Sequence, residues 1–194
     1  ASKSVFVVRV AGNVLGAECL GSMDYAVTHL GDSLKVLAVL GHSGCGAVTA
    51  AVDAFLSPSQ YLSVASSHPI RAVVDRIFVA AQAAAMALAE ANGWDVITKT
   101  GYRTALIEMT VALNAALTAA TLKREFRDKL GPNREVVFGV YNLTTGRVKL
   151  PLSADGDLAI RLAPPPPDAA SFDRLAVLLA TSDAIRGLLS GPPR

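Results

Sequence analysis

A histidine and a cysteine stand three residues apart in the glycine-rich segment Gly41-His42-Ser43-Gly44-Cys45-Gly46. Imidazole nitrogen and thiolate sulfur are ligands that Zn²⁺ favours, and this spacing lets both side chains converge on one ion from a tight turn. The flanking glycines permit such a turn and let the backbone approach a ligand closely. On spacing alone, a buried thiol beside a hydrogen-bonded imidazole is the commoner arrangement. The segment therefore indicates half of a zinc site, whose interpretation depends on its surroundings.

The elements around this segment would place it where α/β proteins bind ligands. The apolar run Lys35-Val36-Leu37-Ala38-Val39-Leu40 directly precedes it and predicts a buried parallel strand. The carboxyl end of such a strand is the usual position of a functional site in an open α/β sheet. Residues 47–55 are expected to continue as a helix from the turn, and Ser57-Pro58-Ser59 is expected to end it.

Two upstream segments supply the context. Val5-Phe6-Val7-Val8-Arg9-Val10-Ala11-Gly12-Asn13 has the pattern of a strand followed by an R-x-A-G-N turn, and residues 20–30 carry G-S-x-x-Y-A-V in a helical pattern. The order of strand, turn, helix, strand and G-H-S-x-C-G closely resembles the β-class carbonic anhydrases. The resemblance covers residues 5–55 and resumes at residues 136–150, where V-F-G-V-Y-N-L-T-T-G-R-V is similar to the family's last strand pair.

The resemblance implies an α/β fold with a mostly parallel central sheet flanked by helices. It implies zinc-dependent, reversible hydration of carbon dioxide to bicarbonate and a proton, in a homodimer or a higher even oligomer. His42 and Cys45 would be zinc ligands, and the backbone N–H of Gly46 would donate to bound bicarbonate. Arg9 falls where some family members hold a regulatory bicarbonate ion, although a salt bridge or a helix-end contact is the alternative for this side chain.

One departure from the family pattern is large. The family's first zinc ligand lies in a C-x-D-x-R motif at the end of a preceding strand, and this sequence has no such motif; its two cysteines are Cys19 and Cys45. The resemblance would place the missing strand between the strands beginning at Val5 and Lys35. Each backbone group orphaned there would cost about 1–3 kcal/mol. We therefore expect that the segment exists in the working protein; the alternative is a chain that has lost it, with Cys19 as a candidate substitute thiolate.

Three functions remain open at this stage. They are the carbonic anhydrase, a hydrolase of the same fold acting on carbon disulfide or carbonyl sulfide, and a non-catalytic domain that retains the scaffold. Ser43 is interpreted as a hydrogen-bonding residue of the turn, because no acid-base triad accompanies it. Structural roles are expected for His29 in its helix, for His68 in an exposed connection, and for Asp24 and Tyr25 in the first turn of their helix.

Composition and charge limit the classes of partner that we expect for this protein. A chain of 194 residues with 52% hydrophobic content can bury one good core, and a net charge of +2 without a basic stripe predicts no nucleic-acid partner. Two cysteines suit a reducing compartment, so we expect a cytoplasmic protein. The most apolar stretch, residues 77–89, contains Gln82 and stops at Glu90, which predicts a buried helix and no membrane partner.

The remaining pattern predicts a domain and a tail. Helices are expected over residues 70–91 and 102–129, and strands over 136–143 and 147–150, joined by a turn. We divide the chain into a domain of residues 1–163 and a tail of residues 164–194, in which a four-proline linker precedes an amphipathic segment over 172–189. The pattern leaves open whether this tail docks on its own domain or on a partner.

Overall fold

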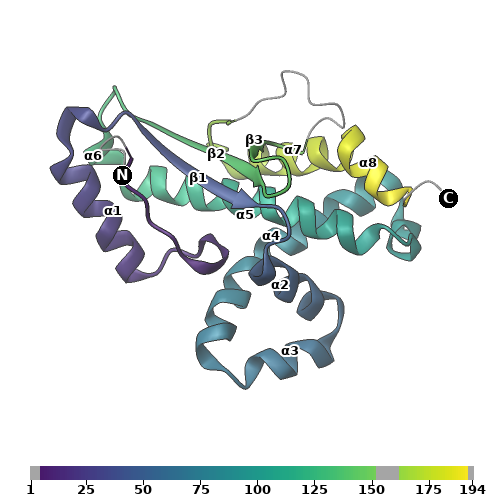
Figure 1. The fold of residues 1–194 in the computed structure, drawn as a ribbon. Helices are drawn as coiled ribbons and strands as arrows, with labels where there is room; N and C mark the ends of the chain where they lie inside the picture. The colour runs from purple at the N-terminus through teal and green to yellow at the C-terminus, as the bar shows by residue number, and fades with distance from the viewer. Residues whose placement is uncertain (1–4, 152–161, 192–194) are drawn as a thin grey trace.

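The computed structural model, which describes residues 5–151 and 162–191, has a small mixed sheet with helices packed around it (Figure 1). Strands β1 (Val36–His42), β2 (Glu135–Asn142) and β3 (Arg147–Lys149) lie in the order β1-β2-β3. The pair β1 and β2 is parallel, and β2 and β3 form an antiparallel hairpin. The predicted fold class and the predicted hairpin are confirmed.

Strand β1 is buried on one face only. Leu37, Val39 and Gly41 are buried, whereas the alternate residues Val36, Ala38 and Leu40 are exposed. The prediction of a fully buried strand is therefore wrong for one face, because within the described residues β1 has helices packed against a single side and a neighbouring strand along a single edge. The parallel register sets His42 beside Tyr141 of β2, so the end of β1 is held by the sheet.

Six helical segments connect β1 to β2. They are α2 (Gly46–Leu56), α3 (Pro58–Ala65), α4 (His68–Asn92), η3 (Trp94–Thr98), α5 (Tyr102–Glu125) and α6 (Arg127–Leu130). Helix α5 packs against both parallel strands and against α4, and its buried alanines and leucines form much of the core. Two predicted boundaries are wrong. The helix predicted over residues 102–129 breaks at buried Phe126. His68 was predicted in a connection but begins α4, because Pro69 suits a first helical turn.

The N-terminal part lies to one side of the sheet (Figure 1). It comprises η1 (Ala11–Asn13), α1 (Ala17–His29) and η2 (Gly31–Ser33). The predicted strand at residues 5–10 is wrong for this structure, because these residues pair with no other described strand. Helix α1 begins earlier than the pattern indicated, so Asp24 lies in mid-helix and pairs with Lys129, and Tyr25 stacks on His29.

The C-terminal tail docks on its own chain. Helices α7 (Ala169–Ala180) and α8 (Asp183–Leu189) pack against α4 and α5, and their N-termini are capped by the side chains of Asp168 and Ser182. This answers the question that the sequence left open about the tail. The division at residues 163 and 164 stays a prediction, and residues 1–4 and 152–161 of the first predicted domain lie outside the described residues.

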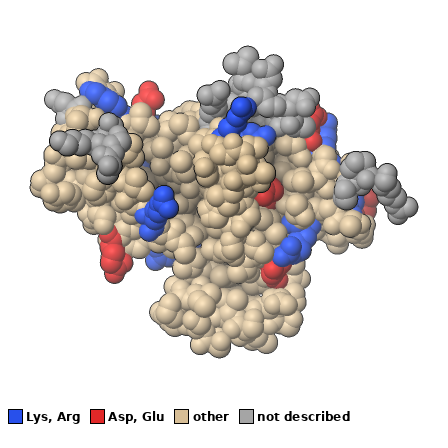
Figure 2. Space-filling view, viewed as in Figure 1, with Lys and Arg blue, Asp and Glu red and all other residues tan. Residues whose placement is uncertain are grey.

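Charged side chains are scattered on the face shown in Figure 2, and the lobe formed by α2 and α3 carries almost none. The sequence has no Lys, Arg, Asp or Glu between Asp53 and Arg71. Helices α4 and α5 are long and apolar enough to cross a membrane by length and composition, and 44% and 72% of their most apolar windows are buried within the fold. Core helices of soluble proteins meet the same criterion, so this is a weak indication.

Candidate functional site

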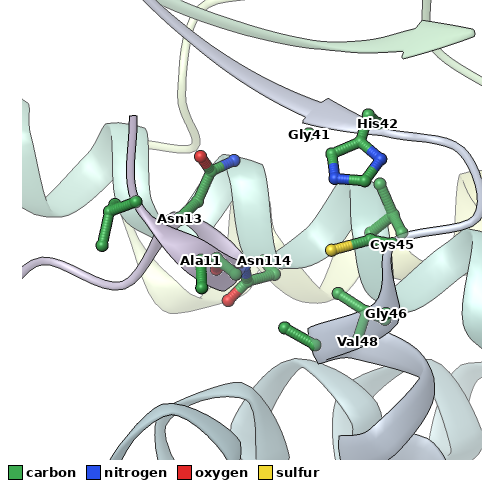
Figure 3. A pocket seen from close by; sticks show the side chains of 12 residues that line it. Ala11, Asn13, Gly41, His42, Cys45, Gly46, Val48 and Asn114 are labelled. Carbon is green, nitrogen blue, oxygen red and sulfur yellow. Dashed lines mark hydrogen bonds between the residues drawn. The ribbon is translucent and has the colours of Figure 1, made fainter. Parts of the chain in front are cut away.

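The end of β1 and the turn that follows it open into a pocket of about 200 Å³. His42 and Cys45 both line it, and in Figure 3 the Cys45 sulfur points into the space below the His42 ring, toward Asn114. The pocket wall is completed by residues of η1, the start of α2 and α5; besides His42 and Cys45, its polar side chains are those of Asn13 and Asn114. The structure thus brings the predicted imidazole and thiol together.

A hydrogen bond defines the available nitrogen of His42. Its Nδ1 lies 3.1 Å from the carbonyl oxygen of Ser43. Because a carbonyl can only accept, Nδ1 carries the proton in this contact and Nε2 keeps a free lone pair. Metal-binding histidines commonly donate their second ring nitrogen in this way, which orients the ring.

Cys45 occupies the N-cap of α2, and Gly46 is the first residue of that helix. The sulfur side chain makes no capping hydrogen bond, and the residue is buried at 6% exposure. The backbone N–H groups of a first helical turn lack intrahelical acceptors and carry a partial positive charge. A bound anion is favoured at such a position, and Gly46 is among the residues that line the pocket.

Ser43 holds the turn against the hairpin. Its backbone N–H donates to the carbonyl of Tyr141 at 3.0 Å, and its Oγ accepts from the N–H of Leu143 at 3.0 Å. Two bonds in opposite directions tie the turn to the end of β2, as expected for a residue that shapes the turn rather than attacking a substrate. Between Ser43 and Cys45, Gly44 adopts a φ of 65°, which the missing side chain permits.

Gly41 sets the distance between the turn and α5. A Cβ at this position would lie 2.8 Å from Cγ1 and 3.1 Å from the carbonyl oxygen of Val111. At Gly41 the strand backbone therefore packs directly against α5, and this close approach helps to place the imidazole of the next residue. Glycine is needed here for space rather than for an unusual φ.

The opposite wall of the pocket is a short segment pinned by three side chains. The Nδ2 of Asn114 donates to the carbonyl of Gly12 at 2.7 Å, and the Oγ1 of Thr118 donates to the carbonyl of Asn13 at 3.0 Å. Asn13 in turn donates from its Nδ2 to the carbonyl of Leu40 at 2.9 Å. Gly12 and Asn13 have φ values of 64° and 54°, a left-handed conformation that Asn tolerates better than most residues.

Glu108 approaches the turn from α5. Burial raises the pKa of its carboxyl group, while a hydrogen bond from the Gly44 backbone acts in the opposite direction. Glu108 lies one helical turn before Val111, so it shares the helix face that Gly41 contacts. The half-buried carboxyl group of Glu108 thus accepts a hydrogen bond from the backbone of Gly44, which lies between the two candidate ligands His42 and Cys45.

The donor set fits zinc in part. A thiol and an imidazole with a free Nε2 are suitable donors, but protein zinc sites use at least three protein ligands. Over residues 5–151 and 162–191, no group of three or more His, Cys, Asp or Glu side chains could hold a metal ion. His42 and Cys45 therefore account for two ligand positions, and the described residues do not complete the shell.

Other predicted residues lie away from this pocket. Arg9 is exposed and is not among the residues that line it. Cys19 lies in α1, where burial raises the pKa of its thiol, and it is not among the residues that line the pocket. His29 donates from Nδ1 to the carbonyl oxygen of Tyr25 within α1, consistent with a structural role.

Sequence reasoning missed Asn13, Glu108, Asn114 and Thr118. A signal for two of them was present, because Thr110, Asn114 and Thr118 recur every fourth residue in an otherwise apolar helical segment. That spacing places them on one stripe of the helix. Polar residues in a stripe of a buried helix require hydrogen-bond partners, and two of these three find theirs in η1.

Comparisons with known proteins agree with this arrangement. The family model described as carbonic anhydrase matches residues 2–148. Carbonic anhydrase 2 of Mycobacterium tuberculosis strain H37Rv is 33% identical over 149 residues, which is 75% of this chain and 62% of that protein, and the protein of the same name in strain CDC 1551 / Oshkosh matches equally. Carbonic anhydrase of Mycolicibacterium smegmatis is 50% identical over 50 residues, 26% of this chain and 23% of that protein. The chain thus spans 62% of the length of the M. tuberculosis relatives.

Proposed function

The chain belongs to the β-class carbonic anhydrase family, and on this basis we propose that it serves zinc-dependent hydration of carbon dioxide to bicarbonate and a proton, with His42 and Cys45 as two of the zinc ligands. One observation carries the proposal. The imidazole and the thiol line one pocket at the carboxyl end of β1, beside the N-terminus of α2. The described residues bring no third His, Cys, Asp or Glu side chain to this pair. The proposal therefore requires at least one further ligand from elsewhere.

Each residue of the turn has a distinct task in this proposal. Zinc, when bound, would lower the pKa of a water molecule at this site toward neutrality and so supply hydroxide near pH 7. His42 would offer Nε2 while its Nδ1–H remains bonded to the Ser43 carbonyl. Cys45 would offer its sulfur from the N-cap position of α2, and the N–H of Gly46 would donate to an oxygen of bicarbonate.

The choice of carbon dioxide rests on the relatives. The M. tuberculosis and M. smegmatis proteins are named carbonic anhydrases, which supports this substrate over carbon disulfide or carbonyl sulfide. The non-catalytic alternative is favoured by one observation, the presence of two rather than three clustered ligands in the described part of the chain. The two functions differ in whether the protein binds zinc, so a metal measurement separates them.

The test compares the two cysteines of the chain. Cys45→Ser should abolish zinc binding and carbon dioxide hydration, whereas Cys19→Ser should retain both, because Cys19 lies in α1 away from the pocket. Zinc is measured by elemental analysis per chain, and hydration by stopped-flow proton release. Zinc at about one ion per chain in the Cys45→Ser protein would refute the ligand assignment. A wild-type protein that binds no zinc and shows no hydration would favour the non-catalytic function.

A further inference from the structure

Asn114 is an amide set into α5, a helix that is largely buried in the core. It is 7% exposed, and its helical neighbours Leu113 and Ala115 are fully buried. Its side chain also lines the pocket that His42 and Cys45 share. Figure 3 shows it between η1 and α2, on the far side of the pocket from the imidazole. A buried amide in such a helix is costly unless both of its polar atoms have partners.

The orientation of this amide is determined by its partner. Nδ2 donates to the carbonyl of Gly12 at 2.7 Å, and a carbonyl cannot donate in return, so the NH₂ group must face Gly12. Oδ1 then faces the other way. No described residue donates a hydrogen bond to Oδ1. In the described part of the chain, every side-chain oxygen that is sealed from solvent has a hydrogen-bond partner, so Oδ1 is not sealed. Oδ1 is therefore reached through the open space that Asn114 lines, which is the pocket.

We infer that Asn114 Oδ1 accepts a hydrogen bond from the hydroxyl group of bicarbonate in this pocket, and that it thereby selects anions that carry an O–H donor. The inference rests on the proposed function, which places bicarbonate here, and it assigns Asn114 as a specificity-determining residue. A buried acceptor such as Asn114 Oδ1 repels the oxygens of an anion that has no O–H group. Binding such an anion also leaves Oδ1 without a hydrogen-bond partner, which costs free energy.

Asn13 is the other amide of the pocket, and it differs from Asn114 in burial. Its Nδ2 is likewise used, by the carbonyl of Leu40, but the residue is only half-buried. An acceptor that already faces bulk water gains little when a ligand replaces that water. The burial of Asn114 therefore makes it the stronger discriminator of the two.

Bicarbonate and nitrate provide a sharp comparison. Both are planar, trigonal monoanions of similar size, and bicarbonate alone has an O–H group. Electrostatic attraction to zinc or to the α2 N-terminus acts on both anions in the same way. A difference in affinity that disappears when Asn114 is replaced would report the acceptor itself.

The experiment titrates ¹⁵N-labelled, zinc-supplemented protein with sodium bicarbonate and, separately, with sodium nitrate. The side-chain NH₂ signals of Asn114, assigned by their loss in Asn114→Leu, report occupancy at this residue without any measurement of activity. Thr118→Val is the matched control, because it also removes a hydrogen bond that pins η1 but does not line the pocket. Melting temperatures confirm that each variant is folded.

We expect bicarbonate to bind the wild-type protein and Thr118→Val roughly threefold to tenfold more tightly than nitrate, and Asn114→Leu to lose this preference. Equal affinities for the two anions in the wild-type protein would overturn the inference, and this comparison requires no variant to fold. A preference that Thr118→Val loses as fully as Asn114→Leu would also overturn it, since the positioning of η1 would then explain the effect. Selective binding without carbon dioxide hydration would refute the proposed function and leave the acceptor role in place.

Discussion

The pocket wall and the C-terminal helices both depend on α5, but they are attached to it by different interactions. The wall formed by η1 is held by directional hydrogen bonds from Asn114 and Thr118 to backbone carbonyls. Helices α7 and α8 are held by apolar side chains such as Leu179 and Ile185, both fully buried. They also lie beyond residues 2–148, the part that matches the family. Hydrogen bonds specify position, whereas apolar contact supplies most of the stability.

This difference predicts where substitutions will act. Changes under α7 and α8 should lower the free energy of unfolding and leave the pocket geometry intact. Changes around the pocket should have smaller effects on stability and larger effects on ligand binding. Four experiments test this contrast, from the largest expected effect to the smallest.

Gly101→Ala should have the largest effect on stability. A Cβ there would lie 1.8 Å from the carbonyl oxygen of Leu188, so α8 must move away and expose Ile185 and Leu189. At about 1.5–3 kcal/mol for each side chain, we expect a loss of roughly 4 kcal/mol, measured by urea denaturation. Gly187→Ala is the control, since nothing lies within 4 Å of its Cβ, and it should stabilise α8 by about 0.5–1 kcal/mol. Equal stability of the two variants would contradict the docking of α8.

Leu179→Ala should cost about 3 kcal/mol, because this α7 side chain has no exposed surface and its removal leaves a cavity against the core. Its neighbour Leu178 is 55% exposed, so Leu178→Ala should change the free energy of unfolding by less than about 0.5 kcal/mol. Thermal unfolding of both variants checks the pair. Similar melting temperatures would mean that α7 presents a different face to the core.

Gly41→Ala should reduce stability less, by about 2 kcal/mol, but should impair zinc binding strongly. The added methyl group meets Val111 at 2.8 Å and displaces the end of β1, which carries His42. Gly21→Ala, with nothing within 4 Å, should leave zinc binding unchanged. If Gly41→Ala binds zinc as well as the wild-type protein does, the contact with α5 does not position the imidazole.

Glu108→Gln should have the smallest effect, and the effect should depend on pH. Burial raises the pKa of Glu108 in the folded protein, so the folded state favours the protonated acid. The associated stability is present below the ordinary value of 4.5 and is lost as the pH rises through the raised pKa. The glutamine variant should therefore gain stability relative to the wild-type protein between pH 4 and pH 7.5, as measured by denaturation at both values. A constant difference would mean that ionisation of Glu108 does not affect folding.

The local sequence determined the elements that carry the candidate ligands. Branched and leucine side chains before Gly41 specified β1, and the glycines around His42 and Cys45 specified a turn into α2. The hairpin of β2 and β3 followed from the strand patterns of residues 136–143 and 147–150 and the turn between them. These features depend on short stretches of chain, so a local pattern is sufficient to predict them.

Only the tertiary structure decided which side chains meet across the pocket. Asn114 and Gly12 are 102 residues apart, and their contact depends on how α5 packs against η1. The same holds for Gly101, whose small size matters because Leu188 lies against it. Residues 5–10 illustrate the converse, because a β pattern becomes a strand only where a partner strand completes its hydrogen bonds. Contacts between distant segments are set by packing of the whole chain, which no local pattern encodes.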